Sequence, residues 1–364
     1  MTRRTKSSLA TAMLRLGRSA GRAMGRSAGH ASRIASDALA AQAEYAAEAT
    51  RQALDAVASP APPPSACEGG GLWHEARWGP GPFATRRYRL YLPPGAGPEH
   101  RVPLLLLLHG CQQDSASFAA CSHVSAFARQ KGVAVLMPEQ ALEANPQRCW
   151  NWFGVEHLVA AESAILMSIV DHVSSTAPVR DDALFAFGMS AGGAMSMTLA
   201  LRYPQRFVAV GSHSGAVADS GHNLRQDGQV LHGRPGPDVE LVHRRLGRHP
   251  LPPLVLIQGD CDPFVAPANA QAAAHLWIGL CHASDRVRGM EPTEVARGGR
   301  HAFVRTDWRR NGDPYVRLLV IRGLGHAWSG GAAGQAYADA LGPDALRLAW
   351  SWFAPELRRR QAAR

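Results

Sequence analysis

The stretch Leu184-Phe185-Ala186-Phe187-Gly188-Met189-Ser190-Ala191-Gly192-Gly193 joins an apolar run to the pattern Gly-x-Ser-x-Gly, and a second apolar run follows at once. The first run predicts a buried strand and the second a helix, so the chain must turn sharply at Ser190. Gly188 and Gly192 have no side chains, which would let the strand and the helix approach closely at this turn. This strand–turn–helix unit predicts a sheet covered by helices.

The serine in this turn has two interpretations. A strained turn that lifts the Ser190 Oγ clear of the end of a strand is typical of a nucleophile elbow. In the plainer interpretation, Ser190 is only the N-cap of the helix that follows. The apolar strand before it and the helix after it favour the nucleophile.

Predicted strands and helices alternate through most of the chain. Besides the strand that leads to Ser190, strands are predicted at residues 85–92, 102–108, 133–137, 207–212, 254–258 and 316–321, and helices at 118–130, 156–174, 268–280 and 336–353. The run 102–108 is apolar throughout, as expected of a strand buried on both faces of a parallel sheet. The alternation predicts an α/β fold, with a mostly parallel, doubly wound sheet and helices on both faces.

The composition changes at a proline-rich segment near residue 60, which predicts a stiff linker. We expect a basic, Ala- and Arg-rich, partly helical extension at 1–58, a Pro/Gly-rich linker at 59–71, an α/β domain at 72–355 with a polar insertion near its site at 216–250, and a basic tail at 356–364.

The net charge of +10 is concentrated at the two ends of the chain. The basic N-terminal arm is interpreted either as a solvated segment or as an amphipathic anchor for an anionic lipid or polymer-granule surface. No zinc-finger spacing or aromatic–basic RNA motif is present, so no nucleic-acid partner is expected. No run approaches the roughly 20 apolar residues of a membrane span. The N-terminus also lacks the apolar segment of an ordinary secretory signal, which slightly favours a cytoplasmic or granule-associated location.

The six cysteines lie far apart and form no C-x-x-C pair, so neither a zinc site nor a redox motif is expected. Cys111 and Cys149 follow two strands predicted to be adjacent. They are therefore candidates for a disulfide.

A serine nucleophile needs a base, and the base needs a group that orients it. When Gly-x-Ser-x-Gly serves in an α/β sheet, an acid and then a histidine follow the serine, each on a loop after a late strand. His326 lies in such a loop between glycines and is the favoured base. His213 is its main rival and is interpreted as lining the cleft. Asp260 and Asp262 both remain candidates for the orienting acid.

The oxyanion of an acyl-transfer reaction needs two preorganised N–H donors. The backbone N–H of Ala191, directly after the serine, is one candidate. The second is expected from the loop after the 102–108 strand, where Cys111 is favoured over Gln112.

An aromatic cluster follows the 133–137 strand and has two interpretations. Trp150, Asn151 and Trp152 either pack in the core or form a wall for the acyl chain, to which Trp328 would contribute.

Six ordered motifs, spread over residues 75–353, resemble the polyhydroxybutyrate depolymerase family of esterases, which is related to feruloyl and acetylxylan esterases. They are Leu108-His109-Gly110-Cys111-Gln112-Gln113, Pro138-Glu139-Gln140, Asn145-Pro146-Gln147-Arg148-Cys149-Trp150-Asn151-Trp152-Phe153, Gly188-Met189-Ser190-Ala191-Gly192-Gly193-Ala194-Met195, His213-Ser214-Gly215 and Gly325-His326-Ala327-Trp328-Ser329-Gly330-Gly331.

This resemblance implies an α/β-hydrolase fold and a catalytic triad of Ser190, Asp262 and His326. The family's Gly-x-x-Asp-x-x-Val loop matches Asp262 with Val265, which decides for Asp262 over Asp260. It also implies hydrolysis of ester bonds in short-chain polyhydroxyalkanoate polymers or oligomers, without a metal or an organic cofactor. The chain departs from the family at Gln258, where a histidine is usual. Many members are secreted.

Two other hypotheses are kept. A feruloyl- or acetylxylan-type carbohydrate esterase would use the same triad. A non-catalytic granule- or surface-binding protein would instead depend on residues 1–58 and would not need Ser190.

Overall fold

The computed structural model describes residues 70–81, 84–220, 231–232, 237–247, 249–296 and 298–362. The chain divides into two compact units, Met1–Pro63 and Pro64–Arg364, and everything described here belongs to the second. The predictions for the N-terminal extension, its surface contact and most of the linker therefore lie outside the described residues.

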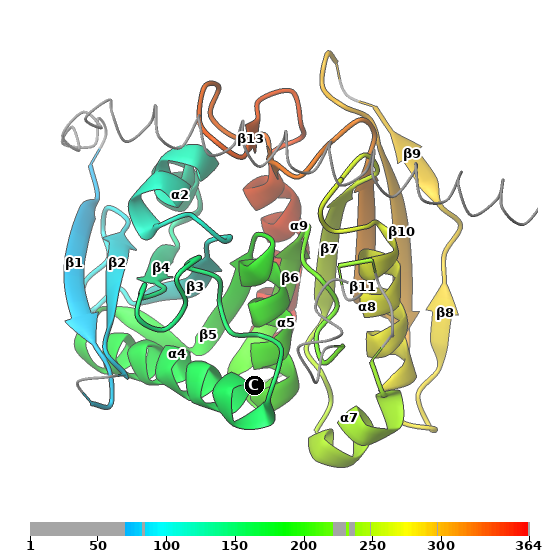
Figure 1. The fold of residues 1–364 in the computed structure, drawn as a ribbon, viewed down its shortest axis with the longest axis horizontal. Helices are drawn as coiled ribbons and strands as arrows, with labels where there is room; N and C mark the ends of the chain where they lie inside the picture. Colours follow the sequence, from blue (N-terminus) through cyan, green and yellow to red (C-terminus); the bar gives the residue numbers. More distant parts are fainter. Residues whose placement is uncertain are drawn as a thin grey trace, which may run out of the picture. The chain divides into compact units, whose positions relative to one another are not determined.

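The second unit is built on an eleven-stranded sheet with the order β1-β2-β4-β3-β5-β6-β7-β11-β10-β8, and β9 also pairs with β10 (Figure 1). The six strands from β4 to β11 in this order are parallel to one another, whereas β1, β2, β8, β9 and β10 pair in antiparallel fashion. The strands are β1 (Leu72–Trp78), β2 (Arg86–Leu92), β3 (Val102–Leu108), β4 (Ala134–Glu139), β5 (Val179–Gly188), β6 (Phe207–His213), β7 (Leu254–Gly259), β8 (Val287–Gly289), β9 (Thr293–Val295), β10 (Phe303–Arg310) and β11 (Asp313–Ile321).

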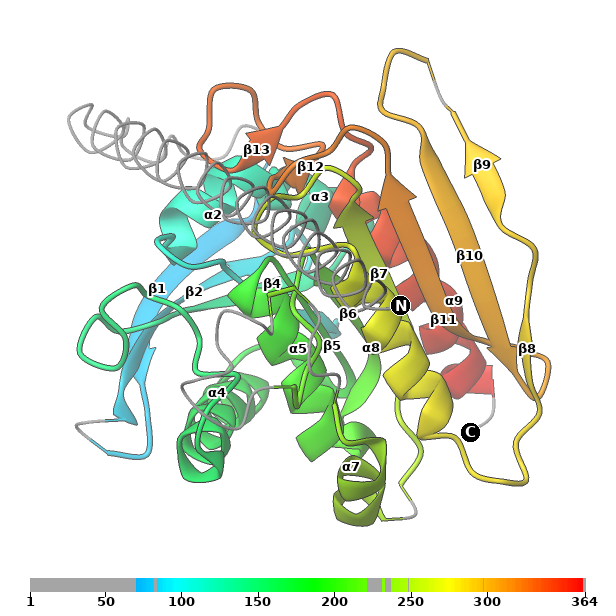
Figure 2. The same cartoon turned by 45° about the vertical axis from the view of Figure 1, so that its right-hand side comes forward.

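Helices cover both faces of this sheet, as the alternating pattern predicted (Figure 2). One face packs against α4 (Glu156–Thr176), α5 (Ala191–Arg202), α7 (Val239–Leu246) and α8 (Ala268–Gly279). The other face packs against α2 (Ser115–Ser122), α3 (Val124–Lys131) and α9 (Ala345–Ala362). A short 3-10 helix, η2 (Pro204–Arg206), and a small two-stranded sheet of β12 (Trp328–Ser329) and β13 (Ala338–Asp339) complete the described elements.

The strand β3 shows why the sheet is buried on both sides. Leu104, Leu106 and Leu108 belong to the hydrophobic cluster on one face, and Leu105 and Leu107 to the cluster on the other. Successive side chains of a strand point to opposite faces, so a continuous apolar run fills both cores. The prediction of a doubly covered parallel strand is confirmed here.

Two predicted helices differ from the observed ones. The helix expected at 118–130 is split into α2 and α3 by His123, whose φ is +55°. The helix expected at 336–353 begins only at Ala345, because Gly342-Pro343 interrupts the chain and Asp344 accepts a hydrogen bond from the Arg347 N–H (2.9 Å). It continues to Ala362, so most of the expected basic tail is helical.

Sequence periodicity also missed the strands β1, β8, β9 and β10. Their residues are mostly half-buried or exposed, so they show no apolar run. These strands form because they pair with a neighbour that is already ordered, a tertiary effect that local pattern does not carry.

Among the described residues, α4 is the one helix whose length and composition would suit a membrane span. Its residues Ile165, Leu166, Ile169 and Val170 pack in the core against the sheet, which accounts for the apolar composition.

The packing of β3 predicts how a core substitution changes the stability of the protein. Leu106 is fully buried in β3, so Leu106→Ala should lower the free energy of unfolding by about 2–5 kcal/mol, measured by urea denaturation. Leu142→Ala, at a side chain that is 51% exposed, serves as the control and should change the stability by less than about 0.5 kcal/mol. Equal effects of the two substitutions would contradict the assignment of β3 to the core.

Candidate active site

Ser190 lies at the carboxyl end of β5 in a conformation that few residues adopt. Its φ is +54° and its ψ is −121°, and its side chain makes no capping hydrogen bond to α5. The Ser190 N–H donates to the carbonyl oxygen of His213 (2.8 Å) and the Met189 N–H to that of Leu108 (3.1 Å), so both neighbouring strands hold the turn. The hydroxyl is therefore free for a role other than an N-cap.

The glycine of the turn at position 192 is required by close packing. A Cβ atom there would collide with the carbonyl oxygens of Leu108 and His109 at the end of β3. The helix α5 can start this close to the sheet only because position 192 has no side chain.

Asp262 and His326 are brought together by two adjacent parallel strands, β7 and β11. The His326 Nδ1–H donates to the Asp262 Oδ2 at 2.8 Å, and the backbone N–H groups of Phe264 and Val265 donate to Oδ1 at 2.9 and 2.8 Å. Burial would raise the pKa of Asp262, but these hydrogen bonds outweigh it and hold the pKa below its usual value. The carboxylate thus stays ionised. Because it holds the proton on Nδ1, the basic nitrogen of the His326 ring is Nε2.

The competing carboxylate has a different role. Asp260 accepts a hydrogen bond from the Gly323 N–H (2.7 Å) and lies 3.5 Å from the Arg322 guanidinium. These contacts join the loop after β7 to the loop after β11. Of the two candidate acids, Asp262 is the one beside His326.

His213, the rival base, is buried and occupied at both ring nitrogens. Its Nε2 accepts a hydrogen bond from the Ser329 N–H (3.1 Å), so the proton sits on Nδ1 and faces the Ser214 Oγ (3.1 Å). Burial, with a smaller contribution from the nearby His326, lowers the pKa of His213 to about 3. The ring also stacks on Trp328 at a centroid distance of 5.1 Å. These contacts suit a neutral ring that supports the His326 loop.

Gln258 stands where the family usually has histidine, and the structure gives it a contact that sequence reasoning did not foresee. It is 1% exposed, and its Nε2 donates to Asp262 Oδ2 (3.2 Å) and to the Val265 carbonyl oxygen (3.0 Å). The side chain therefore clamps the loop and helps to fix the carboxylate. The sequence signals were its departure from the family's usual histidine and its place as the penultimate residue of β7.

Two backbone N–H groups near Ser190 have no acceptor among the described residues. In the loop after β3, the Gly110 N–H donates to the Gln113 Oε1 (2.9 Å) and the Gln112 N–H to the Gln147 carbonyl oxygen (2.8 Å). The N–H of Cys111, which lies between these two residues in the sequence, has no acceptor among the described residues. The same is true of the N–H of Ala191 at the start of α5. This favours Cys111 over Gln112 as a donor to a ligand.

The loop that carries Cys111 is tied down covalently. Cys111 and Cys149 form a disulfide with a Cα–Cα distance of 4.3 Å, which confirms that candidate pair. Beside it, His109 donates from Nδ1 to the Gly110 carbonyl oxygen (2.7 Å) and accepts from the Gln140 N–H at Nε2 (3.1 Å). Burial lowers the pKa of His109, so the ring is a neutral structural part of the loop.

The aromatic residues singled out in the sequence lie in the core. Trp150 is fully buried, and its Nε1–H donates to the His109 carbonyl oxygen (3.0 Å). Trp328 is 1% exposed and packs on Phe187 at the end of β5, and Trp152 is 6% exposed. Packing accounts for these rings, and their contact with a substrate stays a prediction.

Asn151 belongs to a buried polar network. It donates to Glu162 (2.7 Å), which also accepts from Gln140 (2.7 Å) and pairs with Arg86 (3.3 Å). Arg86 and Glu162 are 4% and 2% exposed. Sequence reasoning missed this network because its members are far apart in the chain and no local pattern marks a buried charge.

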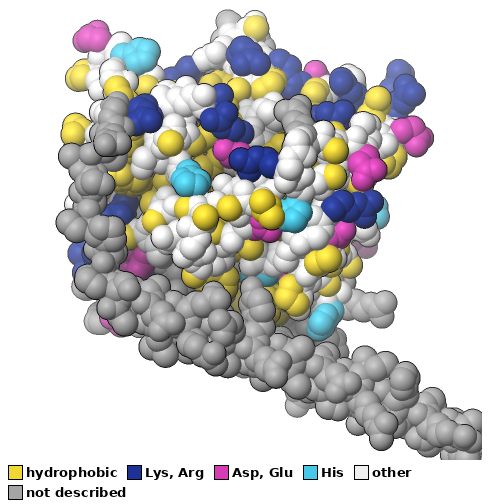
Figure 3. All heavy atoms as spheres, turned by 90° about the horizontal axis from the view of Figure 1, so that it is seen from above, with side chains coloured by type: hydrophobic (Ala, Val, Ile, Leu, Met, Phe, Trp, Pro, Cys, Tyr) yellow, Lys and Arg dark blue, Asp and Glu magenta, His cyan; other side chains and the backbone are white. Residues whose placement is uncertain are grey.

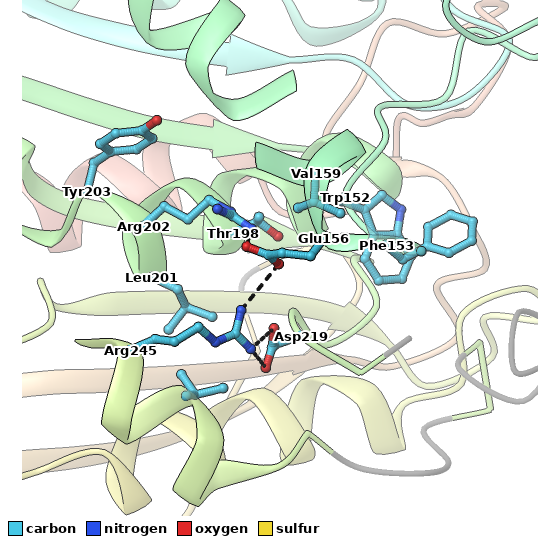
Figure 4. Close-up of a pocket in the computed structure, with 12 residues that line it drawn as sticks. Trp152, Phe153, Glu156, Val159, Thr198, Leu201, Arg202, Tyr203, Asp219 and Arg245 are labelled. Atoms are coloured by element: carbon cyan, nitrogen blue, oxygen red, sulfur yellow. Dashed lines mark hydrogen bonds and ion pairs between the residues drawn. The ribbon is translucent and has the colours of Figure 1, made fainter. Parts of the chain in front are cut away.

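The polar insertion expected at 216–250 is described only in part, at residues 216–220, 231–232, 237–247 and 249–250. The Leu231 carbonyl oxygen accepts a hydrogen bond from the Ala266 N–H (2.9 Å), just after the Asp262 loop, and the position of the whole insertion near the site stays a prediction. Its helix α7 packs on the C-terminal half of α5, and a pocket of about 240 Å³ lies between them and α4 (Figure 4). Arg245 binds both oxygens of Asp219 at 2.8 Å and also Glu156 (3.4 Å), which pairs with Arg202 (2.7 Å). The pocket charges are thus mutually satisfied.

The edge of the sheet that carries Ser190 is shown from above in Figure 3. Lysine and arginine side chains are interspersed there with hydrophobic and acidic ones and form no single basic patch on the visible face. Among the described residues, no three His, Cys, Asp or Glu side chains are grouped as a metal site would require.

The comparisons with known proteins concern the family and the fold. The family model described as "Esterase PHB depolymerase" matches residues 86–294, more than half of the chain. Poly(3-hydroxyalkanoate) depolymerase C of Paucimonas lemoignei is 25% identical over 64% of this chain, and the match spans 56% of that relative's length. Feruloyl esterase B of Neurospora crassa is 24% identical over 40% of this chain and 49% of its own length. Acetyl xylan esterase from Aspergillus awamori shares the fold, with a TM-score of 0.56 and 15% identity over 70% of this chain and 94% of its own.

The buried His213 predicts a pH dependence of stability. Its pKa is about 3 in the folded protein and about 6.5 in an unfolded chain, so the unfolded state binds one more proton between those values. The free energy of unfolding should fall as the pH is lowered through this range, by up to about 1.4 kcal/mol per pH unit from this residue. In urea titrations, His213→Gln should show a shallower dependence, whereas the exposed His243→Gln should not. Identical slopes for all three proteins would contradict a neutral, buried His213.

The disulfide predicts a second effect on stability. The bridge closes a loop with a sequence separation of 38, so the pair Cys111→Ser and Cys149→Ser should lower the free energy of unfolding by about 3–4 kcal/mol in a chain-entropy estimate. The exposed free Cys261→Ser serves as the control. A reductant should shift the urea midpoint of the wild type and of the control but not that of the double variant. A midpoint insensitive to reductant in all three would rule out the bridge.

Proposed function

Because the chain belongs to the esterase PHB depolymerase family, we propose that it is a serine esterase in which Ser190, Asp262 and His326 form the catalytic triad. The observation that carries the proposal is the buried Asp262–His326 hydrogen bond at the same sheet edge as the strained turn at Ser190. An oriented imidazole and an uncapped serine on one edge form the arrangement that nucleophilic catalysis needs.

The proposed reaction proceeds through an acyl-enzyme. The Ser190 Oγ attacks the ester carbonyl carbon while the Nε2 of His326 takes the hydroxyl proton. Asp262 keeps the proton on Nδ1 and stabilises the imidazolium that forms. The N–H groups of Ala191 and Cys111 donate to the oxyanion. His326 then protonates the leaving alcohol and later activates the water that cleaves the acyl-enzyme.

The proposed substrates are short-chain polyhydroxyalkanoates, such as poly- or oligo-3-hydroxybutyrate, or similar short acyl esters. The matches to the Paucimonas lemoignei depolymerase and to the family model support this choice. A feruloyl- or acetylxylan-type activity on the same triad is the second candidate, supported by the match to the Neurospora crassa feruloyl esterase.

The nucleophile is tested with a p-nitrophenyl ester series from acetate to octanoate. Ser190→Ala should reduce kcat/KM by roughly 10⁴-fold or more, because nothing else in the triad replaces the attacking oxygen. Ser175→Ala, at an exposed serine on α4, is the matched control and should keep wild-type activity. Retention of activity in Ser190→Ala would reject the assignment.

The same assay separates the other hypotheses. Release of 3-hydroxybutyrate, rather than ferulate or acetate, from the corresponding substrates supports the polyhydroxyalkanoate esterase. A folded wild type without activity on any of these esters would favour the non-catalytic granule- or surface-binding protein, whose function would rest on residues 1–58.

A further inference from the structure

A second polar cavity opens at the same edge of the sheet as Ser190, on the side of β1 and β2. It has a volume of about 340 Å³ and lies between these strands and the start of α2. Its charged lining consists of four arginines, Arg77, Arg87, Arg89 and Arg148, and three acids, Glu75, Asp114 and Glu139. Nothing in the proposed mechanism uses these residues.

Most of these charges are paired within the cavity. Arg89 pairs with Glu75, and Arg148 lies 3.3 Å from Glu139 and 3.7 Å from Asp114. The Ser115 hydroxyl also donates to Glu139 (3.1 Å). Each of the three acids therefore already has an arginine partner.

Arg77 and Arg87 are the exception. They are direct partners across the antiparallel pair of β1 and β2, so both side chains emerge on the same face of the sheet. Neither guanidinium forms an ion pair among the described residues, although Glu139 of β4 lies opposite Arg87 in the backbone register. Like charges placed directly opposite each other across a strand pair repel. Glu139 offsets this repulsion on the β4 side of Arg87 but is itself paired with Arg148, so an anion between Arg77 and Arg87 would reduce the repulsion that remains.

The charge balance indicates the kind of anion. Four arginines and three acids leave one net positive charge in the cavity. A single carboxylate would neutralise it, and its two oxygens match the forked donors of a guanidinium. A polyanion would meet repulsion from Glu75, Asp114 and Glu139, so a monoanion is favoured.

The distance to Ser190 indicates what carries that carboxylate. Arg87 on β2 pairs with Glu139 at the carboxyl end of β4, so the cavity and Ser190 share one edge. In the order β2-β4-β3-β5, three strand spacings separate β2 from β5, about 14 Å, and β1 lies about 5 Å further. An extended amino-acid residue reaches about 3.5 Å, and a 3-hydroxyacid unit is longer because it has one more chain atom. The gap therefore corresponds to about three or four such units.

We propose that Arg77 and Arg87 bind the free carboxylate end of a short hydroxyalkanoate oligomer while one of its ester bonds is cleaved at Ser190. This inference rests on the proposed function. Attack breaks the bond between the ester carbonyl carbon and the alkoxy oxygen. The acyl part, with the hydroxyl end of the oligomer, stays on Ser190 until water releases it. The leaving part carries the carboxylate end and takes the proton from His326 on its new hydroxyl. Binding of the carboxylate at Arg77 and Arg87 thus determines which ester bond, counted from the carboxyl end, lies at Ser190.

The test compares two forms of one substrate, the linear 3-hydroxybutyrate tetramer with a free carboxylate and the same tetramer capped as its methyl ester. In the wild type, kcat/KM should be roughly tenfold higher for the free acid, the effect of one charge-assisted interaction of about 1.4 kcal/mol. Added salt should reduce this ratio, because the arginines are exposed. The R77Q/R87Q variant should bring the ratio close to one. The ratio is measured on one preparation, so a general loss of activity cancels.

The matched control is R288Q/R358Q, which removes two exposed arginines from β8 and α9 and should keep the tenfold ratio. A wild-type ratio near one, or a preference that survives in R77Q/R87Q, would overturn the proposal. Failure of the wild type to cleave either tetramer, with p-nitrophenyl butyrate still hydrolysed, would overturn the oligomer site alone. Loss of hydrolysis of all three substrates would overturn the proposed function together with it.

Discussion

Close backbone packing at the end of β5 is the constraint on which the site depends. The strand must turn into α5 while the end of β3 lies against the same turn, and there is no space for a side chain at position 192. The turn holds Ser190 at a positive φ, and hydrogen bonds that its backbone donates to carbonyl oxygens at the ends of β3 and β6 fix it there. A residue strained in this way persists only when its surroundings determine its conformation, which the neighbouring strands do here. The position of the serine is thus a property of three strands rather than of one loop.

The groups around Ser190 are fixed by polar contacts that remove freedom from long loops. The Asp262 loop is held by its own backbone N–H groups and by Gln258, and the Cys111 loop by a disulfide and by neutral His109. Gln140, which donates to the Cys149 carbonyl oxygen, connects the disulfide to the buried pair of Arg86 and Glu162. Burial of this pair is tolerable because Gln140 and Asn151 donate to the second carboxylate oxygen of Glu162. Donors that are already in place do not have to reorganise when charge develops on a substrate.

The edge of the sheet therefore carries two chemically different regions. Around β5, β6, β7 and β11 the histidines and the carboxylate are buried and paired, which suits the transfer of a proton. Around β1 and β2 the charged groups are arginine-rich and open to solvent, which suits binding of an anion. The parallel strands supply the first region because their carboxyl ends meet at one edge. The antiparallel pair β1–β2 extends that edge and supplies the second.

The sequence by itself determined the parallel core of the sheet, the turn at Ser190 and the loops of Asp262, His326 and Cys111. These features follow from local physics, since continuous apolar runs predict doubly buried strands, and glycines flank a serine where strand meets helix. The family resemblance had already chosen Asp262 over Asp260, and the tertiary structure added the direct contact with His326. Only the tertiary structure decided that His213 is neutral and enclosed and that Trp150 and Trp328 lie in the core. It also revealed the roles of Gln258, the Arg86–Glu162 pair and the opposed arginines of β1 and β2. Each of these depends on residues distant in the chain becoming neighbours, and on burial and charge pairing that exist only after the strands have assembled.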